Sequence, residues 1–265
     1  MTSVSLEALL RRDRTIVAAT LTLVTALAWV YLLILARQIT SPGMSMPDMP
    51  NMTMAEPALR PWSAADFGVT FAMWAVMMIG MMIPSAATMI LLYARVARQA
   101  AQQGRPLAAT GWFAAGYILS WTAFSVVATV AQGLLQRAAL LTPALAASTN
   151  RVGGVILIAA GIYQWTVLKN ACLTHCRGPL EFVQAHGGFK KTVAGSLGMG
   201  FHHGLYCVGC CWVLMVLLFA GGVMNILWIA AIAAFVLMEK VLPGGYVISR
   251  LAGVGFVAAG LWLIL

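Results

Sequence analysis

The stretch "GVTFAMWAVMMIGMMIPSAATMILLYA", residues 68–94, contains no Asp, Glu, Lys or Arg. This run is longer than the stretch of about 20 apolar residues that an α-helix needs to cross the hydrocarbon core of a bilayer. Similar runs recur along the 265 residues, of which 62% are hydrophobic and only 9% charged. A typical soluble domain carries about 25% charged residues. The sequence therefore predicts an all-α fold, a polytopic transmembrane helix bundle.

We predict about seven spans, near residues 16–37, 68–94, 108–135, 152–168, 193–219, 224–241 and 246–265. Six spans with a re-entrant end are the alternative, because the last two runs are short and Pro243-Gly244-Gly245 separates them. The first run follows three arginines, as in a signal peptide. It is about twice as long as a signal-peptide core and no cleavage site follows it, so it reads as an uncleaved span.

The basic residues lie in short clusters between the apolar runs. With the N-terminus inside, twelve Lys and Arg fall on inner segments and four on outer segments. Cytoplasmic loops carry such an excess of positive charge, so we expect a cytoplasmic N-terminus. This distribution, and not a nucleic-acid partner, accounts for the net charge of +9. The chain then divides into a first anchor at 1–39, an outer loop at 40–66 and a multi-span membrane domain at 67–265.

The outer loop is rich in methionine and proline. It reads "TSPGMSMPDMPNMTMAEP" over residues 40–57 and carries Met44, Met46, Met49, Met52 and Met54. A thioether is a soft ligand suited to Cu(I) and remains a ligand where thiols are oxidised. We expect this loop to capture a soft metal; the alternative is a loop whose methionines dip into the membrane surface.

The second span carries a methionine stripe. At helical spacing, Met78, Met81, Met82, Ser85 and Met89 share one face, and Pro84 should free a backbone carbonyl beside it. Methionine is also a common packing residue in apolar cores. The stripe is therefore either core packing or a set of metal ligands.

The fifth span contains "FHHGLYCVGCCWVLM", residues 201–215. His203, Cys207 and Cys210 follow at i, i+4 and i+7 and share a face, with Cys211 beside them and His202 on a neighbouring face. Polar groups at this depth normally face the bundle interior and mark a site. Gly200 and Gly204 should let another helix approach closely. The pattern predicts a site for copper, zinc or iron; buried cysteines and a hydrogen-bonded histidine that only pack are the alternative.

Two further groups are candidates on the inner side. The inner loop at 169–192 holds Cys172, His175 and Cys176, which His186 could complete to a Cys₂His₂ zinc set. Glu239 ends the sixth span, where it could neutralise a passing cation or pair with an arginine across the bundle; the alternative is a solvated helix end.

Several of these motifs, in order, resemble one family. "WAVMMIGMMIPSA", "CLTHCRGP", "HHGLYCVGCCWVLM", "GGVMN" and "MEK" are similar to the bacterial predicted metal-binding integral membrane proteins, the domain of unknown function 2182 family. The resemblance spans about residues 67–250. It implies a bacterial inner membrane location and metal binding, at Met77, Met78, Met81, Met82, Cys172, Cys176, His203, Cys207, Cys210, Cys211 and Glu239.

We therefore expect an integral membrane protein that handles, relays or delivers a soft metal, most simply Cu(I). Its partners would be the lipid bilayer and a copper chaperone or copper enzyme, with zinc at the inner loop as a further option. The sequence predicts no particular reaction. The alternatives are a membrane thiol oxidoreductase using Cys207 and Cys210, a haem or quinone protein using His202 or His203, and a purely structural subunit.

Overall fold

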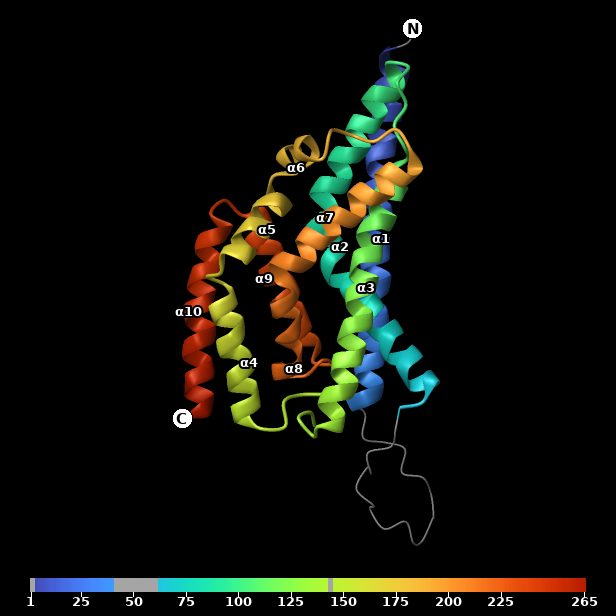
Figure 1. Ribbon diagram of the computed structural model, residues 1–265. Helices are drawn as coiled ribbons and strands as arrows, with labels where there is room; N and C mark the ends of the chain where they lie inside the picture. The colour runs from blue at the N-terminus through green and yellow to red at the C-terminus, as the bar shows by residue number, and fades with distance from the viewer. Residues whose placement is uncertain (1–2, 41–61, 143–144) are drawn as a thin grey trace.

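A computed structural model describes residues 3–40, 62–142 and 145–265 of the protein (Figure 1). Within these ranges the regular elements are all helices. They are α1 (Ser3–Thr40), α2 (Ala64–Gln102), α3 (Thr110–Arg137), α4 (Asn150–Tyr163), α5 (Val167–Arg177), α6 (Pro179–Ala185), α7 (Val193–Val216), α8 (Leu218–Gly221), α9 (Ile226–Val241) and α10 (Gly245–Ile264). The predicted all-α fold is confirmed. The loop methionines Met44, Met46, Met49, Met52 and Met54 lie outside the described residues.

Five of the described helical segments are long and apolar enough to cross a membrane: residues 15–38 of α1, then α2, α3, α7 with α8, and α10. The pair α4 and α5 is a sixth candidate if its two helices, which meet at a bend of 65°, form one span. The span predicted at 224–241 corresponds to α9, which has only 16 residues. A multi-pass architecture thus fits the structure, while the count of seven spans and the side of the N-terminus stay predictions.

Polar caps explain where several helices begin. Asp66 and Ser63 form a capping box at the start of α2, in which the Asp66 carboxylate accepts from the Ser63 backbone N–H at 2.8 Å. The Thr166 hydroxyl accepts from the backbone of Lys169 and starts α5 directly after the bend. Thr192 caps α7 in the same way. Each cap satisfies a backbone N–H that has no partner within its helix.

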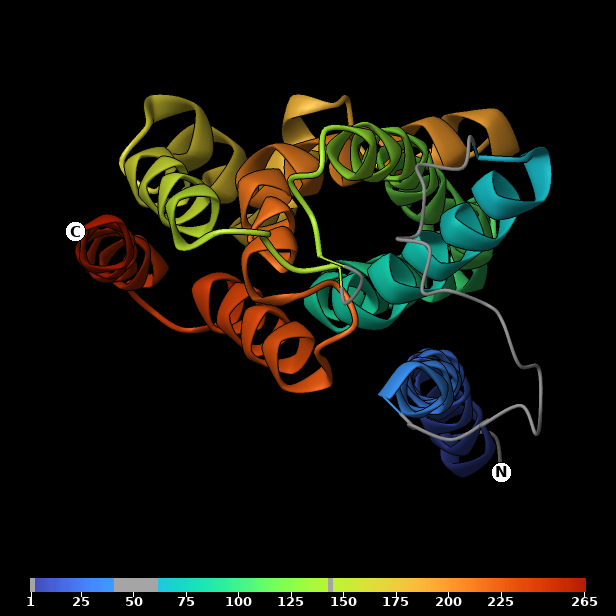
Figure 2. The ribbon, with the colours of Figure 1, turned by 90° about the horizontal axis from the view of Figure 1, so that it is seen from below.

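The helices form a wide, flattened bundle. Seen along the helices, α1 lies at one edge and the α4–α10 pair at the opposite edge, with α2, α3, α7 and α9 between them (Figure 2). Most described side chains of α1 are exposed, among them Leu23, Leu27 and Val30. The buried core comes mainly from α2, α3, α7 and α9. An apolar exposed face is what a helix in contact with lipid presents.

Helices α3 and α7 pack closely because glycine lies at their contact. A Cβ atom on Gly200 would overlap the backbone carbonyl of Phe113, and one on Gly116 would overlap the carbonyl of Leu197. Across the same contact, Ser120 Oγ donates to the Phe201 carbonyl at 2.8 Å. The predicted close approach beside the fifth-span glycines is therefore confirmed, and the partner helix is α3.

Pro84 lies inside α2 and cannot donate to the carbonyl of Gly80, four residues earlier. That carbonyl accepts instead from the indole Nε1 of Trp29 on α1, at 3.3 Å. The carbonyl that the sequence predicted to be free thus fixes α1 against α2 and is not available to the site.

Candidate functional site

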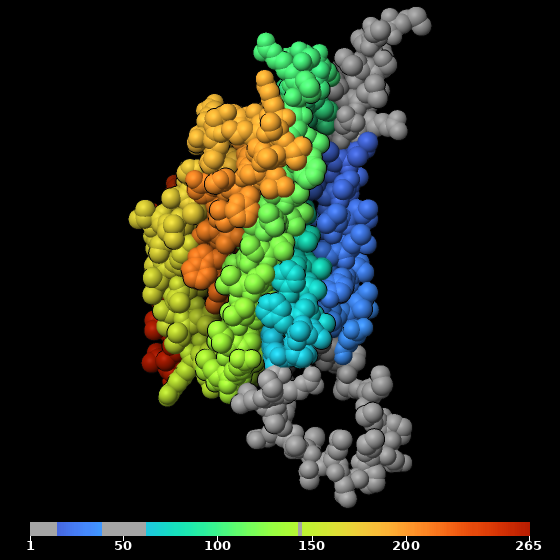
Figure 3. Space-filling model, turned by 45° about the vertical axis from the view of Figure 1, so that its right-hand side comes forward, coloured from blue at the N-terminus to red at the C-terminus, as the bar shows by residue number. Residues whose placement is uncertain are grey.

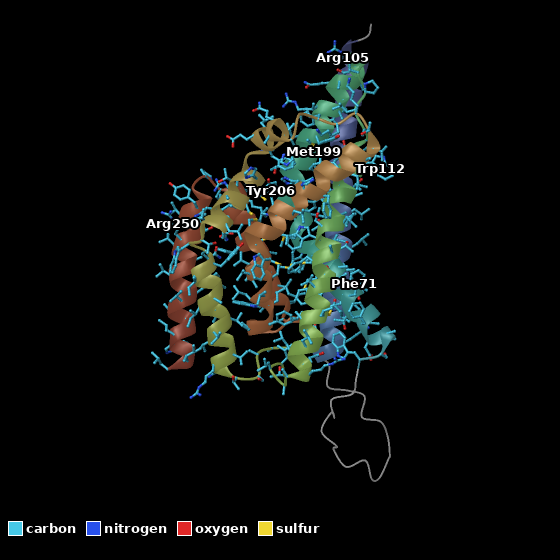
Figure 4. The ribbon with its side chains drawn as sticks, in the orientation of Figure 1. Phe71, Arg105, Trp112, Met199, Tyr206 and Arg250 are labelled. Atoms are coloured by element: carbon cyan, nitrogen blue, oxygen red, sulfur yellow. The ribbon has the colours of Figure 1, made fainter. Side chains whose placement is uncertain are left out.

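The polar face of α7 points into the bundle. His203, Cys207, Cys210 and Cys211 are all buried, with exposed fractions of 3% or less. His202, predicted on a neighbouring face, is exposed. The helical spacing alone therefore placed these side chains on the correct face. Met199 and Tyr206, labelled in Figure 4, mark the same helix just before the cysteines.

Four of the five cysteines gather around one turn of α7. The Cys210 Sγ lies 3.9 Å from the Cys176 Sγ of α5. The thiols of Cys210 and Cys211 both donate to the Cys207 carbonyl, at 3.1 and 2.9 Å. None of the cysteines forms a disulfide. We call Cys176, Cys207, Cys210 and Cys211 the thiol cluster.

Cys207 is the most highly connected member of this cluster. Its Sγ accepts from Lys240 Nζ at 2.8 Å, and the Tyr117 hydroxyl lies 3.0 Å away. Lys240 also donates to Ser85 Oγ at 3.1 Å. One sulfur on α7 is thus joined to side chains of α2, α3 and α9. An ammonium beside sulfur is a charge arrangement that favours a thiolate, the form of cysteine that binds metal.

The methionines of α2 line the same interior. Met77, Met78, Met81 and Met82 are at most 1% exposed. The backbone carbonyl of Met82 accepts from the Tyr117 hydroxyl at 3.1 Å and from Ser85 Oγ at 2.9 Å. Since Tyr117 and the Ser85–Lys240 pair also reach Cys207, this turn of α2 lies beside the thiol cluster.

His203 is packed among aromatic rings. Its ring centre lies 5.0 Å from that of Phe182 and 5.9 Å from those of Phe113 and Tyr117. Among the described residues, no group forms a hydrogen bond to its buried Nδ1. Buried polar atoms normally have a partner. An unpaired imidazole nitrogen one turn before Cys207 on the same buried face is therefore a candidate metal ligand.

The inner-loop residues do not converge on one point. Cys176 contacts Cys210, whereas His175 stacks on Tyr206 with ring centres 4.4 Å apart. Cys172 is buried against Gly209 of α7, and His186 packs on Phe182. The segment is folded into α5 and α6, and it adds one thiol to the cluster on α7 without assembling the Cys₂His₂ set.

Glu239 is held in an ion pair. Lys169 Nζ donates to both of its carboxylate oxygens at 2.9 Å, and Ser249 donates to one of them. The sequence suggested an arginine, a passing cation or a solvated helix end at Glu239; the partner is a lysine, and the 1% exposure of Glu239 rules out the solvated end. Sequence reasoning overlooked Tyr117, and it counted Lys169 and Lys240 as loop charges, so their contacts with Glu239 and Cys207 were not predicted. The signal available was that Lys169 and Lys240 each adjoin an apolar run.

In the part of the chain that the structure describes, no group of three or more His, Cys, Asp and Glu side chains is arranged as a preformed metal site. The thiols meet in pairs and through backbone carbonyls, as the distances above show. This arrangement differs from the closed tetrahedral ligand set of a structural metal site.

A comparison with protein families decides the family. The family model PpoB2, described as "Copper chaperone", matches residues 71–263. The chain belongs to this copper chaperone family. The match covers α3 to α10 and most of α2, so it includes every described candidate residue and excludes α1 and the methionine-rich segment. It supports a copper-related family but not the narrower name that the motifs suggested. No curated protein and no solved structure matches the chain.

Proposed function

We propose that this protein carries Cu(I) as cargo inside the membrane and passes it on to a copper protein. The observation that carries the proposal is the thiol cluster in the bundle interior, with His203, whose Nδ1 has no partner among the described residues, on the same buried face of α7 as Cys207 and Cys210. The chain also belongs to a copper chaperone family. Thiolate and thioether ligands select Cu(I) over harder ions. Cys207, Cys210 and Cys176 are the proposed primary ligands, with Cys211, His203, Met78, Met81 and Met82 as their neighbours.

The absence of a closed ligand set among the described residues suits delivery of the ion better than storage. A closed tetrahedral site binds metal firmly, whereas thiols that meet in pairs can exchange an ion one ligand at a time. Lys240 adds a competing positive charge, because its ammonium lies 2.8 Å from Cys207 Sγ, where a monovalent cation would bind. Arrival of copper displaces this ammonium, and its return at Cys207 assists release.

The burial of the cysteine side chains argues against a thiol oxidoreductase. Cys207 and Cys210 are each 1% exposed, and disulfide exchange requires a partner thiolate to reach a sulfur. The burial of these thiols therefore supports cargo binding over thiol exchange with another protein.

The test is a Cu(I) titration of the purified protein under reducing conditions against a competing chelator. We expect Cys207→Ser and Cys210→Ser each to weaken Cu(I) binding by about 10- to 100-fold or more, since even residues that only support metal ligands have effects of this size. Met215→Leu is the matched control: it removes another buried sulfur of α7, outside the proposed site, and should leave affinity unchanged.

Thermal unfolding of each variant separates lost binding from lost folding. Cys207→Ser protein that unfolds at the wild-type temperature and binds Cu(I) as tightly as wild type would overturn the proposal. Equal losses in Cys207→Ser and Met215→Leu would overturn it as well, because the effect would then not be specific to the thiol cluster.

A further inference from the structure

Three of the four histidines contact the ring of Phe182 or Tyr206, and the fourth, His202, contacts His186, although they come from two separate segments. His175 stacks on Tyr206 at 4.4 Å between ring centres, and His186 packs on Phe182 at 4.3 Å. The other two precede Tyr206 on α7: His203 lies 5.0 Å from Phe182, and His202 lies 5.7 Å from His186. Helices α5, α6 and the first half of α7 bring them together at the end of the bundle where α1 begins (Figure 1).

Local backbone contacts orient the α6 histidine. His186 Nδ1 lies 2.8 Å from the Phe182 carbonyl. A carbonyl only accepts, so Nδ1 carries the proton and Nε2 keeps its lone pair. A backbone carbonyl that holds one ring nitrogen is the usual support of a histidine that binds metal through the other nitrogen.

The separation of His186 and His202 suits a shared ion. Their ring centres are 5.7 Å apart. Two imidazoles on one metal, with metal–nitrogen distances of about 2.0 Å, place their ring centres roughly 6 Å apart. His202 is exposed and His186 half-buried, so an ion between them is within reach of an external partner. This surface, α6 with the first half of α7, is visible beside α3 in Figure 3.

The pair is also continuous with the buried site. Phe182 contacts the rings of both His186 and His203, and His203 is one turn from Cys207. We propose that His186 and His202 form a second, two-coordinate Cu(I) site, through which the ion leaves the thiol cluster for an acceptor. This inference rests on the proposed function for the source of the ion. The ability of the two histidines to bind copper does not depend on that function. Imidazole nitrogen is a suitable ligand for copper, and two ligands release an ion more readily than four.

The experiment combines a Cu(I) titration with the rate of transfer from loaded protein to a soluble chelator. The proposal predicts two classes of bound copper in the wild-type protein. A His186→Gln/His202→Gln variant should lose the weaker class and transfer copper about tenfold more slowly, while the stronger class remains. Gln184→Ala, an exposed change on the same helix, is the control and should match wild type in both measurements.

Comparison with Cys207→Ser separates this inference from the proposed function. Loss of the weaker class in the histidine variant, with tight copper binding unchanged in Cys207→Ser, would support the histidine pair and overturn the thiol site. Unchanged copper classes and an unchanged transfer rate in the histidine variant would overturn the histidine pair, whatever Cys207→Ser does. A rate that falls equally in Gln184→Ala would also overturn it.

Discussion

At the scale of single residues, the chain buries charged side chains at positions where apolar side chains would cost less free energy to bury. Lys169 and Glu239 face each other with exposed fractions of 0% and 2% for their side chains. Taking two ions out of water is costly, and their attraction offsets that cost only when the geometry is good and other hydrogen bonds complete it. Here the bidentate contact and Ser249 do so, and they join α5, α9 and α10 beside the thiol cluster.

This ion pair makes a prediction about stability. Glu239→Gln leaves the Lys169 ammonium buried without a counter-charge, so we expect it to lower the free energy of unfolding by about 3–5 kcal/mol. Adding Lys169→Met to Glu239→Gln should recover most of that loss, since the unpaired charge is then gone. Unfolding in detergent measures both. A double variant no more stable than Glu239→Gln alone would contradict this explanation.

Sequence reasoning placed the candidate ligands of α7 on the correct face but missed what they contact. The spacing of His203, Cys207 and Cys210 defines one helical face by geometry alone. Which residues meet that face depends on the partner helices and their register. Lys240 therefore looked like a loop charge, and Cys176 was assigned to a separate zinc set. Contacts between residues far apart in sequence, such as Tyr117 with Cys207, had no local signal.

At the scale of elements, the close approach of α3 and α7 brings Tyr117 to Cys207. It depends on glycine: a Cβ on Gly200 would overlap the Phe113 carbonyl, whereas a Cβ on Gly198 would meet no atom within 4 Å. These two glycines are two residues apart and therefore lie on opposite faces of α7. Replacing each by alanine separates the effect of packing against α3 from the effect of helix propensity.

We expect Gly200→Ala to push α3 away from α7, lower the unfolding temperature and weaken Cu(I) binding. Gly198→Ala should keep wild-type copper affinity and be as stable or more stable, because alanine favours a helix over glycine by about 1 kcal/mol. Thermal unfolding and the Cu(I) titration of the two variants check this. Equal behaviour of the two variants would show that the α3–α7 contact does not position the site.

The long spans at the element scale could be predicted, because an uninterrupted apolar run has few structural solutions in lipid. The break between α4 and α5 could not, since residues 152–168 read as one continuous run. The bend needs Thr166 to start a new helix, and capping signals inside an apolar stretch are weak. This bend points α5 back toward α7 and is what brings Cys176 to Cys210.

At the scale of the whole molecule, thiols, thioethers and one imidazole occupy the interior while the ends of the bundle carry the charge. Of the twelve basic residues assigned to inner segments, Lys169 and Lys240 contact side chains inside the bundle, Glu239 and Cys207. The remaining ten still exceed the four outer ones, so the expected orientation keeps its basis. In this arrangement copper would enter the thiol cluster and leave past His203 toward the α6 end.

The most direct measurement is X-ray absorption at the copper edge of the Cu(I)-loaded protein, compared with the same spectrum of Cys207→Ser. The thiol cluster as a copper site predicts a first coordination shell dominated by sulfur, with fewer sulfur neighbours when Cys207 is changed. A shell of nitrogen and oxygen alone, or the same sulfur shell in the Cys207→Ser protein, would contradict it.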